Sequence, residues 1–304
     1  MKNKGLAHRL NHAILMAFHG MVNTLPLWFI PLAGGILGDV AYLLIRGKRR
    51  YIVYKNLKIV LGSNENPKKL NRIFRASLQN LGKMILETTA WPRLFTKMDE
   101  WFTVEGEEYL KASLKKGKGV IAISIHLGSF TLICGKLARM GYTLYPIIRP
   151  PHNKVAAEFL DNCMSSWGVR YIPDKPRYVC VKKCHQVLRN NEMIFLTTDL
   201  NVIDKDAIFV EFLGYKVPAF KGPAVLAART GAPVHPMFIV RQKGLHHKII
   251  IDPPLSLKNT GNLQSDVVTN MGLIIKATEH YILKYPEQWL WLHDRWRRMR
   301  KIRE

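Results

Sequence analysis

GVIAISIHLGSFT, from Gly119 to Thr131, is an apolar run that ends at a histidine and is followed at once by small and polar residues. A continuous apolar run is typical of a strand in a sheet that is covered on both faces. We expect this strand to end near His126 and a helix to begin near Gly128. Ligands of α/β proteins bind at the sheet edge where such strands end, so His126 is the first candidate for chemistry.

Strands and helices alternate after this stretch. The expected strands cover 119–125, 142–150, 169–173, 192–199, 232–244 and 246–254, with a further pair over 207–219 that turns at Gly214. The expected helices cover 128–140, 153–167, 178–189, 222–230 and 265–284, and residues 51–100 are also expected to be helical. This alternation predicts an α/β fold with a mixed central sheet flanked by helices.

The N-terminal part contains an apolar segment, Leu25–Ile45, whose length is close to the roughly 20 residues of a spanning helix. Pro26, Pro31, Asp39 and three glycines argue against a simple span, and basic residues lie on both sides of the segment. We expect residues 1–50 to be a helical membrane anchor, interfacial or re-entrant, and residues 51–304 to be the second domain. The alternative is a buried pair of core helices. A cleaved signal peptide is not expected, because no small-residue cleavage site follows.

The charge of the chain indicates an acidic partner. Its 304 residues include 46 Lys and Arg against 22 Asp and Glu, a net charge of +24. Nucleic acid, an anionic membrane surface and an acidic protein all fit such an excess. We expect the basic C-terminal stretch Arg295–Glu304 to bind lipid headgroups. Nucleic acid is the least favoured partner, because no recognition-helix or stacking-sheet motif is visible.

Four cysteines, at positions 134, 163, 180 and 184, are scattered through the chain. Their number and the absence of a signal peptide indicate a reducing, cytoplasmic-facing compartment. Cys180, Cys184 and His185 are too few ligands, in no recognisable pairs, for a metal site. No metal is therefore expected.

Several blocks in a fixed order carry a resemblance to a known family. They are NLKIVLG (Asn56–Gly62), HLGSF (His126–Phe130), IIRP (Ile147–Pro150), the long block Phe209–Arg241, and YPEQWLWLHDRWRRMR (Tyr285–Arg300). With these blocks the chain resembles the bacterial lipid A biosynthesis acyltransferases, the lauroyl/myristoyl transferase family, a branch of the lysophospholipid acyltransferase superfamily. The resemblance covers nearly the whole chain.

The resemblance implies that His126 is the base of a catalytic motif, in which a histidine is followed by four residues and then Asp or Glu. Position 131 departs from that motif, because it is Thr. Removing the orienting carboxylate from a comparable catalytic histidine costs about four orders of magnitude in rate. Three alternatives follow. The Thr131 hydroxyl holds the ring, another carboxylate such as Asp199 or Glu211 takes the role, or the chemistry has been lost.

Residues near His126 are candidates for holding a developing oxyanion or a phosphate. The amides of Gly128, Ser129 and Phe130 would open the helix that follows, and such helix starts attract anions. Gly128 and Ser129 are therefore candidate substrate-binding residues.

Further candidates come from other strand ends and helix starts. Arg149 ends its strand with the side chain best suited to bidentate phosphate contact, and the resemblance implies that this block binds substrate phosphate. Asp199 ends the strand 192–199 and resembles the acidic position that the family has there. Lys221 and Gly222 begin another helix that could hold an anion.

The resemblance implies a membrane-associated O-acyltransferase that needs no cofactor. It would move a fatty acyl chain from an acyl thioester, on acyl carrier protein, to a hydroxyl of a glycolipid such as a lipid A precursor. The implied place is the cytoplasmic face of the inner membrane. One alternative keeps the chemistry but changes the acceptor to a phospholipid or another glycolipid. A second, motivated by Thr131, is a non-catalytic lipid-binding relative.

Overall fold

A computed structural model describes residues 2–151, 153–202 and 207–301 of the chain. Its centre is a seven-stranded sheet with the strand order β1-β9-β8-β2-β5-β3-β4. The bounds are β1 Phe102–Glu105, β2 Val120–Ser124, β3 Leu144–Ile148, β4 Ile172–Pro173, β5 Met193–Thr197, β8 Val234–Arg241 and β9 His247–Ile251. The pairing of β8 with β9 is antiparallel and the other pairings are parallel. The predicted mixed α/β sheet is thus confirmed.

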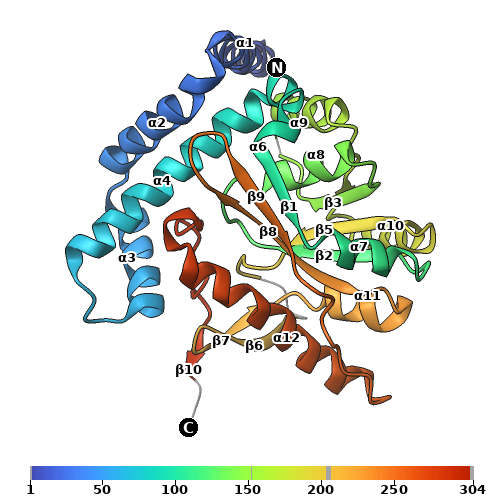
Figure 1. Ribbon diagram of the computed structural model, residues 1–304. Coiled ribbons are helices and arrows are strands. Elements are labelled where there is room, and N and C mark those ends of the chain that lie inside the picture. Colours follow the sequence, from blue (N-terminus) through green and yellow to red (C-terminus); the bar gives the residue numbers. More distant parts are fainter. Residues whose placement is uncertain (1, 152, 203–206, 302–304) are drawn as a thin grey trace.

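Strand β2 lies inside the sheet, and its alternate residues belong to two different hydrophobic cores. Ile121 and Ile123 pack with one group of helices, and Val120 and Ala122 pack with another. The first group contains α10 (Arg177–Arg189), α11 (Gly222–Thr230) and α12 (Leu263–Lys284), and the second contains α8 (Thr131–Arg139) and α9 (Lys154–Ser166). A strand buried on both faces needs apolar residues at every position, which explains the unbroken apolar run in the sequence. Figure 1 shows these layers.

A small antiparallel sheet lies below the central one in Figure 1. It consists of β6 (Ile208–Phe212), β7 (Tyr215–Ala219) and β10 (Arg300–Lys301). The predicted strand pair is confirmed, with its turn at Leu213 and Gly214, both of which have positive φ.

The C-terminal basic stretch is divided between core and surface. Arg295 and Trp296 are each only 1% exposed, and Arg295 donates to the carbonyl of Pro218 (2.7 Å). Burial lowers the pKa of Arg295 to about 10. The expectation that the stretch binds headgroups is therefore wrong for these two residues, whereas Arg297 and Arg298 are exposed. Residues 302–304 lie outside the described residues.

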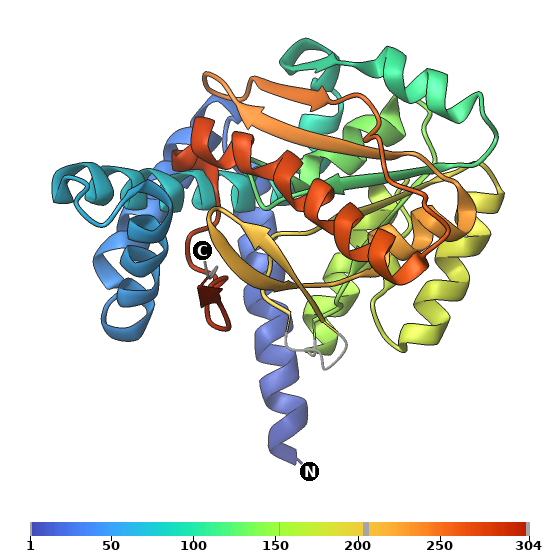
Figure 2. The same ribbon diagram turned by 90° about the horizontal axis from the view of Figure 1, so that it is seen from below.

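The N-terminal part is an arm of helices beside the α/β body. It contains α1 (Lys2–Thr24), the 3₁₀ turn η1 (Leu27–Phe29), α2 (Ile30–Leu44), α3 (Gly47–Leu61) and α4 (Pro67–Thr89). Shorter helices follow: α5 (Trp91–Phe95), α6 (Met98–Trp101), α7 (Glu107–Leu114) and, near the C-terminus, η2 (Pro286–Gln288). Figure 2 shows α1 projecting away from the body. In the described chain, residues Leu27–Leu44 form one segment that is long and apolar enough to span a membrane by length and composition.

Helix α2 packs on α4 with almost no space between the two backbones. A Cβ atom added to Gly38 would lie 2.3 Å from the Cα of Gln79, and one added to Gly82 would lie 2.2 Å from the carbonyl oxygen of Gly34. The Asp39 carboxylate accepts two bonds of 2.7 Å from Arg75 across the same contact. Glycine at these positions is thus required by helix–helix contact.

This packing gives a prediction about Gly38. We expect Gly38→Ala to lower the free energy of unfolding by about 1–3 kcal/mol, because the new methyl group forces the two helices apart. Gly35→Ala is the matched control on the same helix, since its Cβ would meet nothing nearer than the Lys83 Cε at 3.6 Å. The control should be neutral or slightly stabilising. Equal losses for both variants in denaturant unfolding would contradict the packing described.

Candidate active site

His126 and Asp199 face each other because their strands pair in parallel and in register. Ser124 at the end of β2 is paired with Thr197 at the end of β5. His126 lies two residues after Ser124 and Asp199 lies two residues after Thr197, so both side chains are at the same edge of the sheet. The His126 Nδ1 lies 2.8 Å from the Asp199 Oδ1, and the His126 backbone amide donates to the Asp199 Oδ2 (3.0 Å).

The Asp199 carboxylate is held by three donors. In addition to the two from His126, the indole Nε1 of Trp289 donates to its Oδ2 (2.8 Å). Asp199 and Trp289 are buried, whereas the His126 side chain is 16% exposed. With Nδ1–H donated to the carboxylate, a neutral ring carries its lone pair on Nε2. The Nε2 makes no hydrogen bond to any of the described residues.

Burial and the carboxylate act in opposite directions on the pKa of His126. Burial alone would lower the pKa of this imidazole, but the charge and hydrogen bond of Asp199 outweigh burial and raise it above 6.5. Burial would likewise raise the pKa of Asp199, yet the imidazolium and the donated hydrogen bonds lower it. The pair is therefore arranged so that Asp199 stays ionised and favours a proton on His126.

Thr131 lies elsewhere. It is the first residue of α8, and its hydroxyl is 2.8 Å from the hydroxyl of Thr88 on α4. No hydrogen bond joins it to His126 among the described residues. Glu211, the other carboxylate considered, is an exposed residue of β6. Of the three alternatives raised by Thr131, the second requires another carboxylate beside His126. The contact between His126 and Asp199 meets this requirement.

The turn that follows His126 is tied to the C-terminal segment. The Leu290 amide donates to the His126 carbonyl (3.1 Å) and the Gly128 amide donates to the Gln288 carbonyl (3.0 Å). Gly128 has a φ of +57°, and a Cβ there would lie 2.4 Å from the Ile239 carbonyl oxygen. The expected helix start at Gly128 is therefore wrong, since α8 begins at Thr131.

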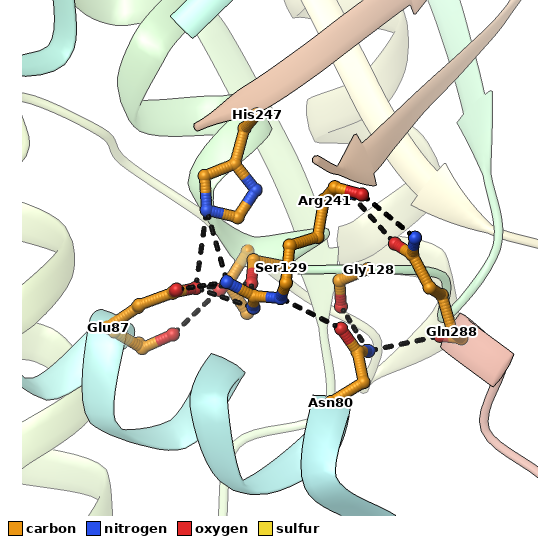
Figure 3. Close-up of polar contacts among 9 residues, drawn as sticks. Asn80, Glu87, Gly128, Ser129, Arg241, His247 and Gln288 are labelled. Atoms are coloured by element: carbon orange, nitrogen blue, oxygen red, sulfur yellow. Dashed lines mark hydrogen bonds and ion pairs between the residues drawn. The ribbon is translucent and has the colours of Figure 1, made fainter. Parts of the chain in front are cut away.

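These bonds decide which amides of the turn are available to a ligand. The amide of Gly128 is already donated, and those of Ser129 and Phe130 have no acceptor among the described residues. The Ser129 side chain is fully buried in a polar cluster with Glu87 and Arg241, shown in Figure 3. Ser129 as a whole is buried and keeps its hydroxyl inside the protein, whereas Phe130 is partly exposed, so of these two amides only that of Phe130 belongs to a residue with exposed surface.

A cavity of about 940 Å³ brings together the other predicted residues. Arg149, Lys221 and Gly222 line it, and so do Thr198 and Asn201, on either side of Asp199 in the chain. His126 and Asp199 are not themselves in its wall. Part of the lining is apolar and comes from Ile147, Val181, Leu196, Val225, Leu226 and Met271. The wall thus combines cationic and hydrocarbon surface.

Arg149 lines this cavity, but its guanidinium is paired with a carboxylate. Its Nε and Nη2 donate to the Asp174 Oδ2 at 2.8 and 2.6 Å, and its side chain is 68% exposed. A ligand phosphate at Arg149 would have to share or displace this carboxylate. Lys221 is the N-cap residue of α11, as its position in the sequence predicts.

The described residues contain no group of three or more His, Cys, Asp or Glu side chains that could hold a metal ion. Cys180 and Cys184, considered as ligands from the sequence, are not joined in a disulfide and line the cavity.

Sequence reasoning missed Trp289, Gln288, Glu87 and Arg241. The first two lie in the block Tyr285–Arg300, which the sequence analysis singled out without assigning its polar residues a role. Glu87 and Arg241 gave a weaker signal: a carboxylate on a helix face and an arginine at the end of an apolar strand.

Comparison with known proteins agrees with the resemblance. The model of the family described as bacterial lipid A biosynthesis acyltransferase matches residues 6–298. The lipid A biosynthesis lauroyltransferase of Escherichia coli K12 is 24% identical over 284 residues, which are 91% of this chain and 88% of that protein. The palmitoleoyltransferase of the same strain is 23% identical over 82% of this chain and 79% of its own length. A lipid A biosynthesis acyltransferase of Haemophilus influenzae is 24% identical, with 84% and 80% covered.

The contact between His126 and Asp199 can be tested by titration. We expect Asp199→Asn to lower the pKa of His126, because the neutral amide no longer stabilises the imidazolium and burial then dominates. NMR of histidine-labelled protein measures this pKa, with His126→Gln to assign the signal. Glu211→Gln is the control and should leave the pKa unchanged. Equal values in wild type and Asp199→Asn would contradict the geometry.

Proposed function

Because the chain belongs to the bacterial lipid A biosynthesis acyltransferase family, we propose that it transfers a fatty acyl chain from acyl carrier protein to a hydroxyl of a lipid A precursor. The observation that carries this proposal is the His126–Asp199 pair, which lies at the carboxyl ends of β2 and β5. Two of the relatives named above are a lauroyl- and a palmitoleoyltransferase, so the proposed acyl group is a medium or long chain.

The pair supports general-base chemistry. The Nε2 of His126 takes the proton of the acceptor hydroxyl as the hydroxyl oxygen attacks the thioester carbonyl. The tetrahedral intermediate then collapses, the C–S bond breaks, and the departing thiolate takes the proton from the imidazolium. Asp199 stabilises the imidazolium between these two steps, which is the role of the carboxylate in a catalytic triad. Ester and thiol are the products, and His126 returns to its neutral form.

The negative charge of the tetrahedral intermediate needs donors. The amide of Phe130 is suited to this role, because it belongs to the turn beside His126, comes from a partly exposed residue and is not donated to a described acceptor. The Phe130 ring packs edge-on against the His126 ring, with 4.6 Å between the ring centroids. Donors fixed in place before the reaction are often the largest single contribution to a catalytic rate.

The cavity beside Asp199 fits an amphiphilic substrate. Its apolar wall suits a hydrocarbon chain, and Arg149 and Lys221 suit a phosphate or another anionic group of the acceptor. We assign this cavity to the lipid substrates, and we assign Arg149, Lys221 and Gly222 to substrate binding.

The N-terminal helices support a position at the cytoplasmic face of the inner membrane. The outer face of α2 carries exposed apolar side chains, among them Leu32, Ile36 and Leu43 at 55%, 53% and 67% exposure. Its opposite face is packed on α4 through Gly34 and Gly38. Because α4 carries several charged residues and cannot follow α2 across a bilayer, α2 lies in the plane of one leaflet. Arg46, Lys48 and Arg49 follow α2 and suit anionic headgroups.

Purified protein, acyl carrier protein thioesters and lipid A precursor test the function. We expect wild type to form the acylated lipid, and His126→Ala to be slower by about 10²–10⁴-fold, the usual contribution of a general base. His280→Ala, which changes an exposed histidine of α12, is the control.

Thr131→Glu is the discriminating arm of the same assay. We expect no gain in rate, since Asp199 already occupies the Nδ1 side of His126 and the change removes the contact with Thr88. A large gain would mean that the site lacks its carboxylate. No acyl transfer by wild type, together with unchanged lipids in a deletion strain, would favour a non-catalytic lipid-binding protein and contradict the proposal.

Membrane binding has a separate test. Leu32 and Leu43 are eleven residues apart and share one face of α2. We expect Leu32→Asp/Leu43→Asp to reduce binding to phosphatidylglycerol-containing vesicles at least about tenfold, because two charges would enter the acyl boundary. Leu283→Asp alters a residue of α12 that is 50% exposed and is the control. Equal binding of wild type, Leu32→Asp/Leu43→Asp and Leu283→Asp in a flotation assay would contradict the assignment of α2.

A further inference from the structure

A cluster of buried polar side chains around Glu87 and Arg241 contacts Gly128 and Ser129, in the turn that follows His126 (Figure 3). Glu87 of α4 and Arg241 at the end of β8 form a two-point ion pair. The Arg241 Nη2 donates to the Glu87 Oε2 at 2.8 Å, and its Nη1 donates to the Oε1. The side chains are 0% and 8% exposed, so this pair is almost entirely removed from water.

Ser129 is bound to both members of the ion pair. Its hydroxyl donates to the Glu87 Oε2 (2.6 Å) and accepts from the Arg241 Nη2 (2.7 Å). The hydroxyl therefore has one donated and one accepted bond, both to ionised groups, which make stronger hydrogen bonds than neutral partners do. The turn beside His126 is thus anchored through one side chain.

A second set of bonds holds the turn from the side of Gly128. The Asn80 Nδ2 is shared between the carbonyls of Gly128 (3.4 Å) and Gln288 (3.1 Å), and the Asn80 Oδ1 accepts from the Arg241 Nε (3.2 Å). The Arg241 backbone amide donates to the Gln288 Oε1 (2.8 Å), and the Gln288 Nε2 donates to the Arg241 carbonyl (3.0 Å). Arg241 is therefore the residue on which both sets of bonds converge.

Stability alone is a weak reason for such a pair. Burying an ion pair costs several kcal/mol of hydration per ion, and well-packed apolar side chains of similar volume often give equal or greater stability. An apolar pair could not hold the Ser129 hydroxyl, however. What the ion pair adds is a fixed position for Ser129, and with it a fixed position for the turn.

We propose that Glu87 and Arg241 are positioning residues for acyl transfer: they hold Ser129 so that the amide of the next residue, Phe130, stays in place beside His126 for the carbonyl oxygen of the thioester. This inference rests on the proposed function, and it adds residues from α4 and β8 that do not touch substrate.

Ser129→Ala tests the link between the ion pair and the turn. We expect kcat to fall about 10–100-fold, as for a small misplacement of reacting groups, with KM and the acid limb of the pH–rate profile unchanged because His126 and Asp199 keep their contact. Ser113→Ala is the matched control. It removes a hydroxyl that is equally buried and bonded to His235 at 2.8 Å, away from the turn, and it should keep the wild-type kcat.

The double variant Glu87→Met/Arg241→Leu separates positioning from stability. We expect it to remain folded at the assay temperature, since apolar side chains replace the ion pair, while its kcat falls at least as far as that of Ser129→Ala. Wild-type kcat at an unchanged melting temperature would overturn the proposal. So would a fall in kcat for Ser113→Ala equal to that for Ser129→Ala.

A readout without turnover keeps this proposal separate from the proposed function. Hydrogen exchange of the peptide spanning 126–131, followed by mass spectrometry, should be faster in Ser129→Ala than in Ser113→Ala or wild type. If wild type transfers no acyl group, the proposed function fails, and unchanged exchange in Ser129→Ala would in addition overturn the anchoring. If wild type is active and exchange and kcat are both unchanged in Ser129→Ala, only the inference about Glu87 and Arg241 fails.

Discussion

The parallel, in-register pairing of β2 with β5 is the constraint on which the candidate site depends. It brings the ends of two strands that are more than 70 residues apart in the chain to the same edge of the sheet. His126 lies two residues after Ser124, and Asp199 lies two residues after its paired residue Thr197. A shift of one residue in this register would move Asp199 away from the imidazole. The buried apolar faces of β2, which pack into two separate cores, hold the register in place.

The same geometry pairs the threonine at position 131 with α4 and not with the imidazole. In the family to which this chain is related, the resemblance implies a carboxylate at this place, beside the histidine. Here the residue begins α8 and bonds to Thr88, while a carboxylate from β5 occupies the Nδ1 side of the imidazole. A catalytic histidine needs an oriented ring and a nearby negative charge, and neither requirement specifies which strand supplies the carboxylate.

Much of the fold could be predicted from local pattern. The unbroken apolar run at 119–125 gave the buried strand, and the turn at Gly214 gave the small hairpin. The start of α8 at Thr131 could not be predicted in this way, because the left-handed backbone of Gly128 and its close approach to the Ile239 carbonyl belong to the tertiary structure. Asp199 is predictable as a site residue because it ends a strand, but its contact with His126 depends on strand order. Trp289 and Arg241 reach the site only through tertiary structure, and no spacing in the sequence relates them to His126.

The central claim, that Asp199 is the carboxylate of the catalytic pair, is tested most directly by the pH dependence of acyl transfer in wild type and Asp199→Asn. His126 must be neutral to accept a proton, so the wild-type rate should rise with pH through a pKa above 6.5. In Asp199→Asn the rise should move to lower pH, because burial now dominates the pKa, and the plateau should fall by about two to four orders of magnitude. A variant with the wild-type plateau and the wild-type acid limb would contradict the account.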